Sequence, residues 1–188
     1  MLQREILHVQ LVGLHAAAAV AGRPELASEP FVIAHSTPGA RVMDVSPLAH
    51  ARGIRIGSAV WEVRAMLGQV TAIAPDLQAY TTRRADAIDV MLRYTPQLQP
   101  LGNDQVFLDV TGSLRMCGGL DALLERLRAD LVEEIGILPA VGIAPNPLLA
   151  RIANAVGSPM GINHLPCQPT REGLANLPVE LLWVVETR

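Results

Sequence analysis

The sequence predicts a mixed α+β protein with a substantial hydrophobic core. Short apolar runs of strand length alternate along the chain with longer segments whose apolar residues recur at helical spacing. Half of the 188 residues are hydrophobic and 18% are charged, which excludes disorder as a description of the whole chain. The length suits one domain of moderate size, or one and a half small lobes that share a core.

The N-terminal part of the chain predicts a strand, a helix and two further strands. A mostly apolar run at residues 5–12 is typical of a buried strand, and the alanine-rich segment 14–21 favours a helix. Short strands are predicted at residues 30–34 and 40–45, on either side of the turn-forming sequence STPG.

The next segment predicts helices of two lengths around one strand. Residues 46–67 indicate two short helices interrupted at Gly53 and Gly57, and a strand follows at residues 70–74. Residues 78–94 indicate one longer amphipathic helix, because their apolar side chains fall on one side and their charged side chains around the rest.

The C-terminal half predicts a hairpin, a helix and another strand. The hairpin joins strands at residues 98–101 and 105–110, and its turn contains the sequence GND. Leucines at helical spacing predict a helix at residues 120–135, and the apolar run at 139–144 predicts a strand.

A last helix is predicted at residues 147–156. It begins with Pro147, an acceptable first helical residue, directly after the capping residue Asn146. The order of strand, helix, hairpin, helix and strand is ferredoxin-like, and residues 22–78 form a separate small lobe inserted into it.

Composition and charge exclude several classes of protein. The net charge of −3 and the pI near 5.9 argue against a self-sufficient nucleic-acid binder, which needs a clustered cationic face. All 15 basic residues are arginine, so lysine-dependent phosphate and Schiff-base chemistry are excluded.

Targeting and cysteine patterns indicate a cytoplasmic protein. No apolar run reaches the roughly 18 residues that a membrane span needs. Glu5 and His8 interrupt the segment in which a secretory signal would be unbroken and apolar. Cys117 and Cys167 are too few for a disulfide framework and lack the spacing of a zinc site.

Several segments, in chain order, resemble motifs of one enzyme family. HVQLVGLHAAAA resembles its opening strand, ARGIRIGSAVWEVRAML a fingers segment, and GNDQVFLDVTG the pattern S-I-D-E-x-F-L-D-V-T. Further matches are RPELASEPFVIA, VGIAPNPLLARIANAVGSPMGI and LPVELLW. On these motifs the chain resembles the Y-family translesion DNA polymerases of the DinB and UmuC type.

The resemblance implies a fold and its subdomains. We expect a ferredoxin-like palm at residues 1–21 and 79–165 and a small α/β fingers lobe at residues 22–78. Residues 166–188 resemble the start of the thumb, so we expect a truncated thumb and no little finger.

The resemblance also implies a catalytic centre, and this sequence departs from it. In the family, three palm carboxylates hold two Mg²⁺ ions for nucleotidyl transfer. The matching positions here are Gln10, Asp104 and Gln105, so one carboxylate remains. A unit charge about 4 Å away contributes about 4 kcal/mol at an effective dielectric near 20, and twice that towards a divalent ion. We therefore expect no metal cofactor.

The positions matched to the nucleotide contacts depart as well. His15 stands at the aromatic gate, Pro47 and His50 replace a tyrosine and an arginine, and Pro147 replaces a lysine. A proline offers neither a charge nor a backbone donor. Core positions keep their apolar character, which is typical of a retained scaffold with a lost active site.

Other polar residues have simpler interpretations. Asp109 is expected to hold a turn rather than a metal, and His8 to be a hydrogen-bonded edge residue. The arginines that could form a phosphate-facing patch are expected to be solvated instead. They are Arg52, Arg55, Arg64, Arg83 and Arg84.

Three functions remain open from the sequence. The first is a non-catalytic protein of DNA repair and damage tolerance, similar to the inactive ImuB-type subunits, which binds DNA weakly and works with repair or replication proteins. The second is an active or weakly active, Mg²⁺-dependent nucleotidyltransferase in which Asp104 and Asp109, together with a substrate phosphate, hold one metal ion. The third is a fragment with no activity of its own.

Overall fold

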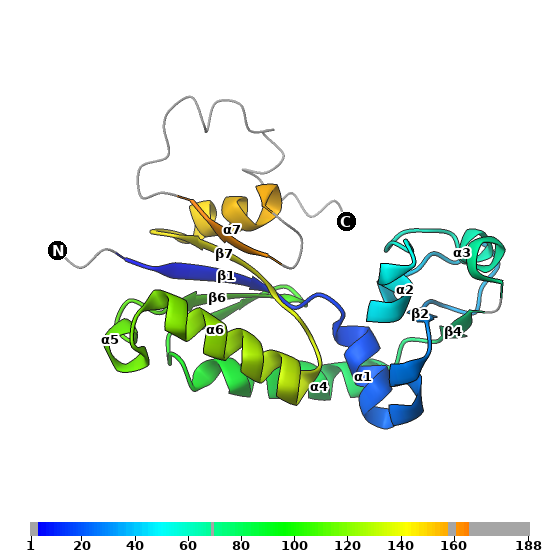
Figure 1. Cartoon of the computed structure of the whole chain (residues 1–188), viewed down its shortest axis with the longest axis horizontal. Helices are drawn as coiled ribbons and strands as arrows, with labels where there is room; N and C mark the ends of the chain where they lie inside the picture. Colours follow the sequence, from blue (N-terminus) through cyan, green and yellow to red (C-terminus); the bar gives the residue numbers. More distant parts are fainter. Residues whose placement is uncertain (1–3, 69, 158–160, 166–188) are drawn as a thin grey trace. The chain divides into compact units, whose positions relative to one another are not determined.

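The computed structural model describes residues 4–68, 70–157 and 161–165, which belong to two compact units (Figure 1). The five-stranded unit comprises the described parts of Met1–Val12, Asp89–Leu131 and Leu138–Arg188. The three-stranded unit comprises the described parts of Gly13–Ile88 and Val132–Ile137.

The sheet of the five-stranded unit has the order β5-β6-β1-β7-β8. The central strand β1 runs antiparallel to both of its neighbours, and β8 runs parallel to β7. The strand order β7-β1-β6-β5 confirms the ferredoxin-like prediction, and β8 is an additional strand that the sequence analysis missed. The strands are β1 (Ile6–Gln10), β5 (Leu98–Leu101), β6 (Gln105–Asp109), β7 (Ala140–Ala144) and β8 (Ile162–His164).

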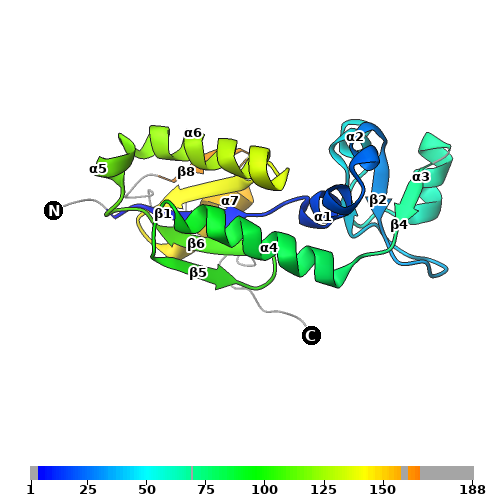
Figure 2. The ribbon, with the colours of Figure 1, turned by 90° about the horizontal axis from the view of Figure 1, so that it is seen from below.

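Helices cover both faces of this sheet. The helix α6 (Leu120–Asp130) and the end of α4 (Leu77–Leu92) lie on one face, and α7 (Pro147–Val156) lies on the other (Figures 1 and 2). The predicted helix at residues 120–135 is α6 followed by a π-helical turn, η2 (Leu131–Ile135). A short helix, α5 (Leu114–Cys117), was not predicted.

The crossing of α7 over β7 depends on Gly142. A Cβ atom at this position would overlap the carbonyl oxygen of Ala150 and lie 2.6 Å from the backbone nitrogen of Asn154. Both atoms belong to the backbone of α7, which cannot move aside as a flexible side chain would. Glycine at this position therefore allows the helix to lie directly on the strand.

The sheet of the three-stranded unit has the order β3-β2-β4, with β2 antiparallel to β3 and parallel to β4. Val32 packs in a cluster with residues of α2 and α3, whereas Phe31 and Ile33 pack with residues of α1 and η1. Alternation along β2 thus gives this small sheet a core on each face. Its elements are α1 (Leu14–Gly22), η1 (Pro24–Ser28), β2 (Phe31–Ile33), β3 (Asp44–Val45), α2 (Pro47–Ala51), α3 (Val60–Leu67) and β4 (Thr71–Ile73).

The predicted strand at residues 40–45 is shorter than expected. Only Asp44 and Val45 pair with β2. The backbone N–H of Val42 instead donates to Ser58, and its carbonyl accepts from Gly57. Residues 40–42 thus pair with this second loop segment, and the chain reaches β2 only at Met43, whose N–H donates to Ile33.

The compact units do not coincide with the predicted subdomain ranges. Residues 13–21 and 79–88, predicted as palm, belong to the three-stranded unit. Compactness does not identify polymerase subdomains, so the palm and fingers ranges remain predictions. The predicted thumb start at residues 166–188 and Cys167 lie outside the described residues. In the described part of the chain, no helix combines the length and apolar character needed to cross a membrane.

Candidate functional site

Gln10, Asp104 and Gln105 meet where β1 and β6 end. Gln10 is the register partner of Gln105 on the neighbouring antiparallel strand. Asp104 closes the hairpin turn before β6, and its carbonyl oxygen accepts a 2.7 Å hydrogen bond from the backbone N–H of Leu11. Backbone pairing therefore brings together all three positions that the resemblance matched to metal ligands, and each is half-buried.

The donor set of these residues does not fit two Mg²⁺ ions. It contains one carboxylate and two neutral amides, whereas Mg²⁺ is bound through anionic oxygens. Within residues 4–68, 70–157 and 161–165, no group of three or more His, Cys, Asp or Glu side chains is arranged to hold a metal ion.

The side chain of Gln105 belongs to a buried hydrogen-bond network. Its Oε1 lies 3.1 Å from Nε2 of His8, and Nδ1 of His8 lies 3.0 Å from Nδ2 of Asn154 on α7. The Asn154 Nδ2 also donates to the backbone carbonyls of His8 and Ala140, so Nδ1 of His8 is an acceptor. The Nε2–H of a neutral imidazole then donates to Gln105.

The environment of His8 favours its neutral form. Burial lowers the pKa of the imidazole, the hydrogen bond with Gln105 partly offsets this, and the nearby charge of Arg151 lowers it further. His8 is 2% exposed and lies on the central strand β1. The expectation of a hydrogen bond is confirmed, but the expectation of an edge position is wrong.

We expect acid to weaken the fold through His8. The folded pKa is lowered, so the unfolded chain binds the proton first as the pH falls through about 6.5. The free energy of unfolding should therefore decrease from pH 7.5 to pH 5.5, measured by urea unfolding with circular dichroism. His8→Gln should show a shallower decrease, and an unchanged slope would contradict this assignment.

Three residues that the resemblance matched to nucleotide contacts lie in α1 and α2 of the three-stranded unit. The His15 ring of α1 stacks on Tyr80 of α4, with ring centroids 4.2 Å apart and an interplanar angle of 23°. Pro47 is the first residue of α2, directly after the N-cap Ser46, whose side chain accepts a hydrogen bond from Ala49. His50 lies in the last turn of α2, half-buried.

In the five-stranded unit, Pro147 and Asp109 are placed as the sequence analysis expected. Pro147 begins α7 after Asn146, whose Oδ1 accepts a 2.9 Å hydrogen bond from the backbone of Leu149. Asp109 holds a turn by accepting hydrogen bonds from the backbone of Thr111 and from Arg4. Burial opposes ionisation of Asp109, but these hydrogen bonds outweigh it and lower its pKa.

Sequence reasoning missed Asp44, a carboxylate that is only 4% exposed. Its Oδ2 accepts from the backbone N–H of Ala16 at 3.0 Å, and its Oδ1 accepts from Val45 at 2.9 Å. The helix α1 begins after Gly13, which has no side chain to cap it. The carboxylate of Asp44, which lies on β3, caps the start of the helix instead. Burial raises the pKa of Asp44, and these hydrogen bonds and the nearby His15 partly offset the rise.

The five arginines singled out in the sequence do not share one role. Arg55 donates to the carbonyls of His50 and Ile54. Arg83 donates to the carbonyl of Glu134 and lies 3.8 Å from the Asp86 carboxylate. Arg52 and Arg64 line an open hollow of the three-stranded unit.

A family model described as the impB/mucB/samB family matches residues 14–155. This range begins after Gln10 and includes Asp104, Gln105 and Pro147.

Curated proteins and solved structures also match the chain. It is 27% identical to the DNA polymerase IV of Desulfatibacillum aliphaticivorans over 98% of this chain and 47% of the relative. It is 28% identical to the DNA polymerase IV of Caulobacter vibrioides over 94% of this chain and 44% of the relative. The chain thus spans about half the length of these curated relatives.

Among solved structures, an insertion ternary complex of Dbh DNA polymerase has the same fold. The two superpose with a TM-score of 0.77 at 16% identity, over 97% of this chain and 55% of that chain.

Proposed function

Because the chain belongs to the impB/mucB/samB family, we propose that it is a non-catalytic relative of the Y-family DNA polymerases that acts in DNA repair and damage tolerance. In this proposal it is a cytoplasmic binding or adaptor protein with weak, non-specific affinity for DNA and with repair or replication proteins as partners. The observation that carries the proposal is the hydrogen bond between Gln105 and the buried His8, beside Gln10.

Electrostatics supports the loss of catalysis. The three positions bring one negative charge where the family chemistry uses three, and an amide oxygen is a weaker ligand for Mg²⁺ than a carboxylate. In addition, the Gln105 Oε1 already accepts a hydrogen bond from His8. The chain's own residues at this point stabilise the sheet rather than an incoming cation.

The residues at the nucleotide-contact positions support the same conclusion. The triphosphate of a nucleotide requires cationic side chains or backbone donors. Pro47 and Pro147 supply neither, because each is the first residue of a helix and lacks a backbone N–H.

The alternative is a weakly active, metal-dependent DNA polymerase. The printed names of the relatives and the retained Asp104 favour it. In that case Asp104 would hold the one remaining metal ion, and incorporation of nucleotides would depend on its carboxylate.

Manganese binding separates the two proposals. The assay reports on the metal site itself, so it does not need the parts of the relatives that this chain does not cover. Mn²⁺ is titrated into the chain and followed by electron paramagnetic resonance, with Asp104→Asn as the test variant and the exposed Asp121→Asn as the control. We expect no saturable binding that depends on Asp104. Saturable binding that Asp104→Asn abolishes and Asp121→Asn keeps, together with primer extension in Mn²⁺, would establish the polymerase instead.

Restoring the carboxylates should not restore polymerisation. We expect Gln10→Asp combined with Gln105→Glu to incorporate no more deoxynucleotide than the natural chain in a primer-extension assay with Mg²⁺ or Mn²⁺. The reason is that Pro47, His50 and Pro147 still leave the triphosphate without cationic contacts. Manganese titration of the same variant serves as the control for restored metal binding, and robust incorporation would refute the prediction.

A further inference from the structure

The strand β4 forms an outer edge of the three-stranded sheet, and no strand of the described residues pairs with its other side. On its inner side β4 pairs with β2, and the carbonyl oxygen of Ile73 accepts a 2.9 Å hydrogen bond from the N–H of Ala34. Ile73 thus turns its backbone groups towards β2. Because this direction alternates along a strand, the N–H and carbonyl groups of Ala72 point away from β2. Thr71 and Ala72 are exposed, so this edge is accessible to another chain.

The edge of β4 lacks the side chains that usually prevent pairing with another chain. Residues 70–74 have the sequence VTAIA, which includes no proline and no charged side chain. Three of the five are β-branched, which favours strand pairing. At the outer edge of the five-stranded sheet, in contrast, β5 contains Pro100, which lacks a backbone N–H. The edge of β4 can therefore accept an added strand.

Opposite charges lie before and after β4, each beside an exposed apolar side chain. Arg64 and Met66 belong to the last turn of α3, which ends shortly before the strand, and Met66 is 63% exposed. Asp76 and Leu77 follow the strand, where Asp76 is exposed and Leu77 is 73% exposed. A second, antiparallel copy of β4 would bring its end beside the start of the first. The two ends are complementary in charge, and both carry apolar surface.

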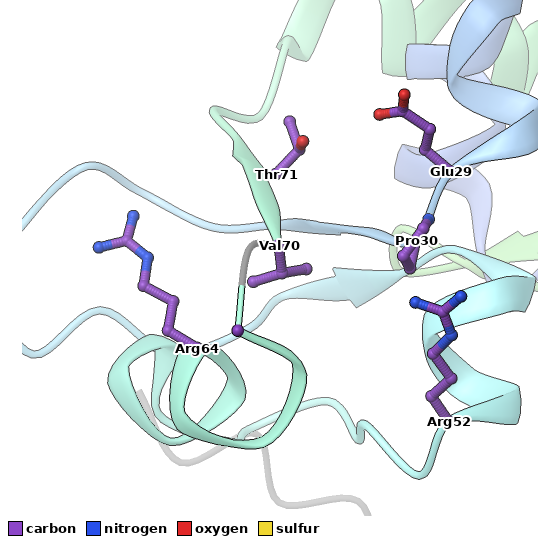
Figure 3. Close-up of a pocket in the computed structure, with 7 residues that line it drawn as sticks. Glu29, Pro30, Arg52, Arg64, Val70 and Thr71 are labelled. Atoms are coloured by element: carbon purple, nitrogen blue, oxygen red, sulfur yellow. The ribbon is translucent and has the colours of Figure 1, made fainter.

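Neither charge is neutralised by another side chain. Among the residues that the structure describes, the Arg64 side chain makes no hydrogen bond or ion pair. Glu29 lines the same open hollow, but Figure 3 shows Glu29 and Arg64 on opposite sides of Val70. The Asp76 carboxylate accepts a hydrogen bond from the backbone N–H of Ala79 and forms no ion pair in the described part of the chain. Both charges are therefore available to another molecule.

We propose that two copies of the chain associate through β4, paired antiparallel about a twofold axis at Ala72. The N–H and carbonyl groups of one Ala72 then bond to those of the other. By the same alternation, Val70 of each copy pairs with Ala74 of the other. The association joins the two small sheets into one continuous sheet. It goes beyond the proposed function and does not depend on it.

This register brings the two complementary ends together. Gly68, four residues before Ala72, comes opposite Asp76, four residues after it. Because Arg64 and Gly68 line the same hollow, Arg64 of each copy meets Asp76 of the other. Leu77 then lies beside the end of α3 of the other copy, which covers part of its exposed surface. Each dimer thus contains two equivalent pairs of opposite charges.

Sedimentation equilibrium of the natural chain tests the association. The interface is small, so we expect a dimer with a dissociation constant of about 0.1 mM at low salt. The charge pairs are exposed, so the affinity should fall about threefold when the salt concentration is raised to about 0.5 M. A chain that remains monomeric at about 1 mM and low salt would overturn the proposal.

Charge reversal tests the register. Arg64→Glu places two pairs of like charges in its own dimer, and so does Asp76→Arg, so each variant alone should dimerise about tenfold more weakly. An equimolar mixture of the two variants should regain the affinity of the natural chain, because both pairs of the mixed dimer are again opposite in charge. Arg126→Glu, at an exposed position of α6 in the other unit, is the matched control and should dimerise like the natural chain.

Ala72→Pro tests the backbone pairing. It removes the outward N–H of Ala72 and keeps the hydrogen bond between Ile73 and Ala34, so it should abolish the dimer. Ala72→Thr keeps the N–H and should keep the dimer.

The proposal is overturned if the mixed charge variants fail to dimerise, or if Ala72→Pro dimerises like the natural chain. Should one set of variants fail to fold, as judged by circular dichroism, the other set decides. None of these outcomes bears on whether Asp104 holds a metal ion, so the proposed function is tested separately.

Discussion

Replacing Gly142 with alanine is expected to lower the free energy of unfolding of the chain by about 3 kcal/mol. The added Cβ would overlap the Ala150 carbonyl oxygen and crowd the backbone nitrogen of Asn154. To relieve the overlap, α7 would have to move away from β7. That movement would also stretch the hydrogen bonds from Asn154 to the carbonyls of His8 and Ala140.

The measurement is urea unfolding followed by circular dichroism at pH 7.5. Gly112→Ala is the matched control, because Gly112 is exposed and a Cβ there would have no heavy atom within 4 Å. The control should change stability by less than about 0.5 kcal/mol. If the free energy of unfolding of Gly142→Ala lies within about 1 kcal/mol of that of the natural chain, α7 can shift at little cost and the prediction is wrong.

The sequence analysis predicted most elements of the fold and missed those that depend on distant contacts. Hydrophobic periodicity is a local property, and it was sufficient for β1, α6 and α7. The strand β8 is three residues long and mostly half-buried at the edge of the sheet. Its sequence therefore shows no clear alternation of apolar and polar residues. Similarly, residues 40–42 have the composition of a strand, but their pairing with residues 57–60 shortens β3.

The candidate site was only partly predictable for the same reason. Gln10, Asp104 and Gln105 were found through the family resemblance, and strand pairing brings them together. The contact between His8 and Asn154 joins residues 146 positions apart, which no local pattern reports. Asp44 was missed because the helix end that it caps is 28 residues away.

The hydrogen bond of Gln105 explains why a neutral amide suits this position of the fold. A buried polar group is stabilising only when its hydrogen bonds are satisfied. Gln105 offers an acceptor to His8 without introducing a charge beside a neutral, buried imidazole. The amide at position 105 therefore satisfies the hydrogen bonding beside β1 without adding a charge.

Replacing Asp44 with alanine is the second large effect that we expect, a loss of about 3 kcal/mol in the free energy of unfolding. The variant leaves the buried backbone N–H groups of Ala16 and Val45 without acceptors and uncaps α1. Asp76→Ala is the control, because Asp76 is exposed and accepts a comparable hydrogen bond from Ala79 near the start of α4. Losing such an exposed cap should cost about 1 kcal/mol.

The pH dependence of a third variant, Asp44→Asn, tests the role of charge at this buried site. Burial raises the pKa of Asp44, so the folded chain binds its proton more readily than the unfolded chain above pH 3.9 or so. The contribution of Asp44 to stability is then largest at low pH and decreases as the pH rises through the folded pKa. Asparagine does not titrate, so its destabilising effect should be greater at pH 4 than at pH 7 in urea unfolding. The reverse order would mean that the hydrogen bonds from the start of α1 outweigh burial and that the ionised carboxylate is the form the fold prefers.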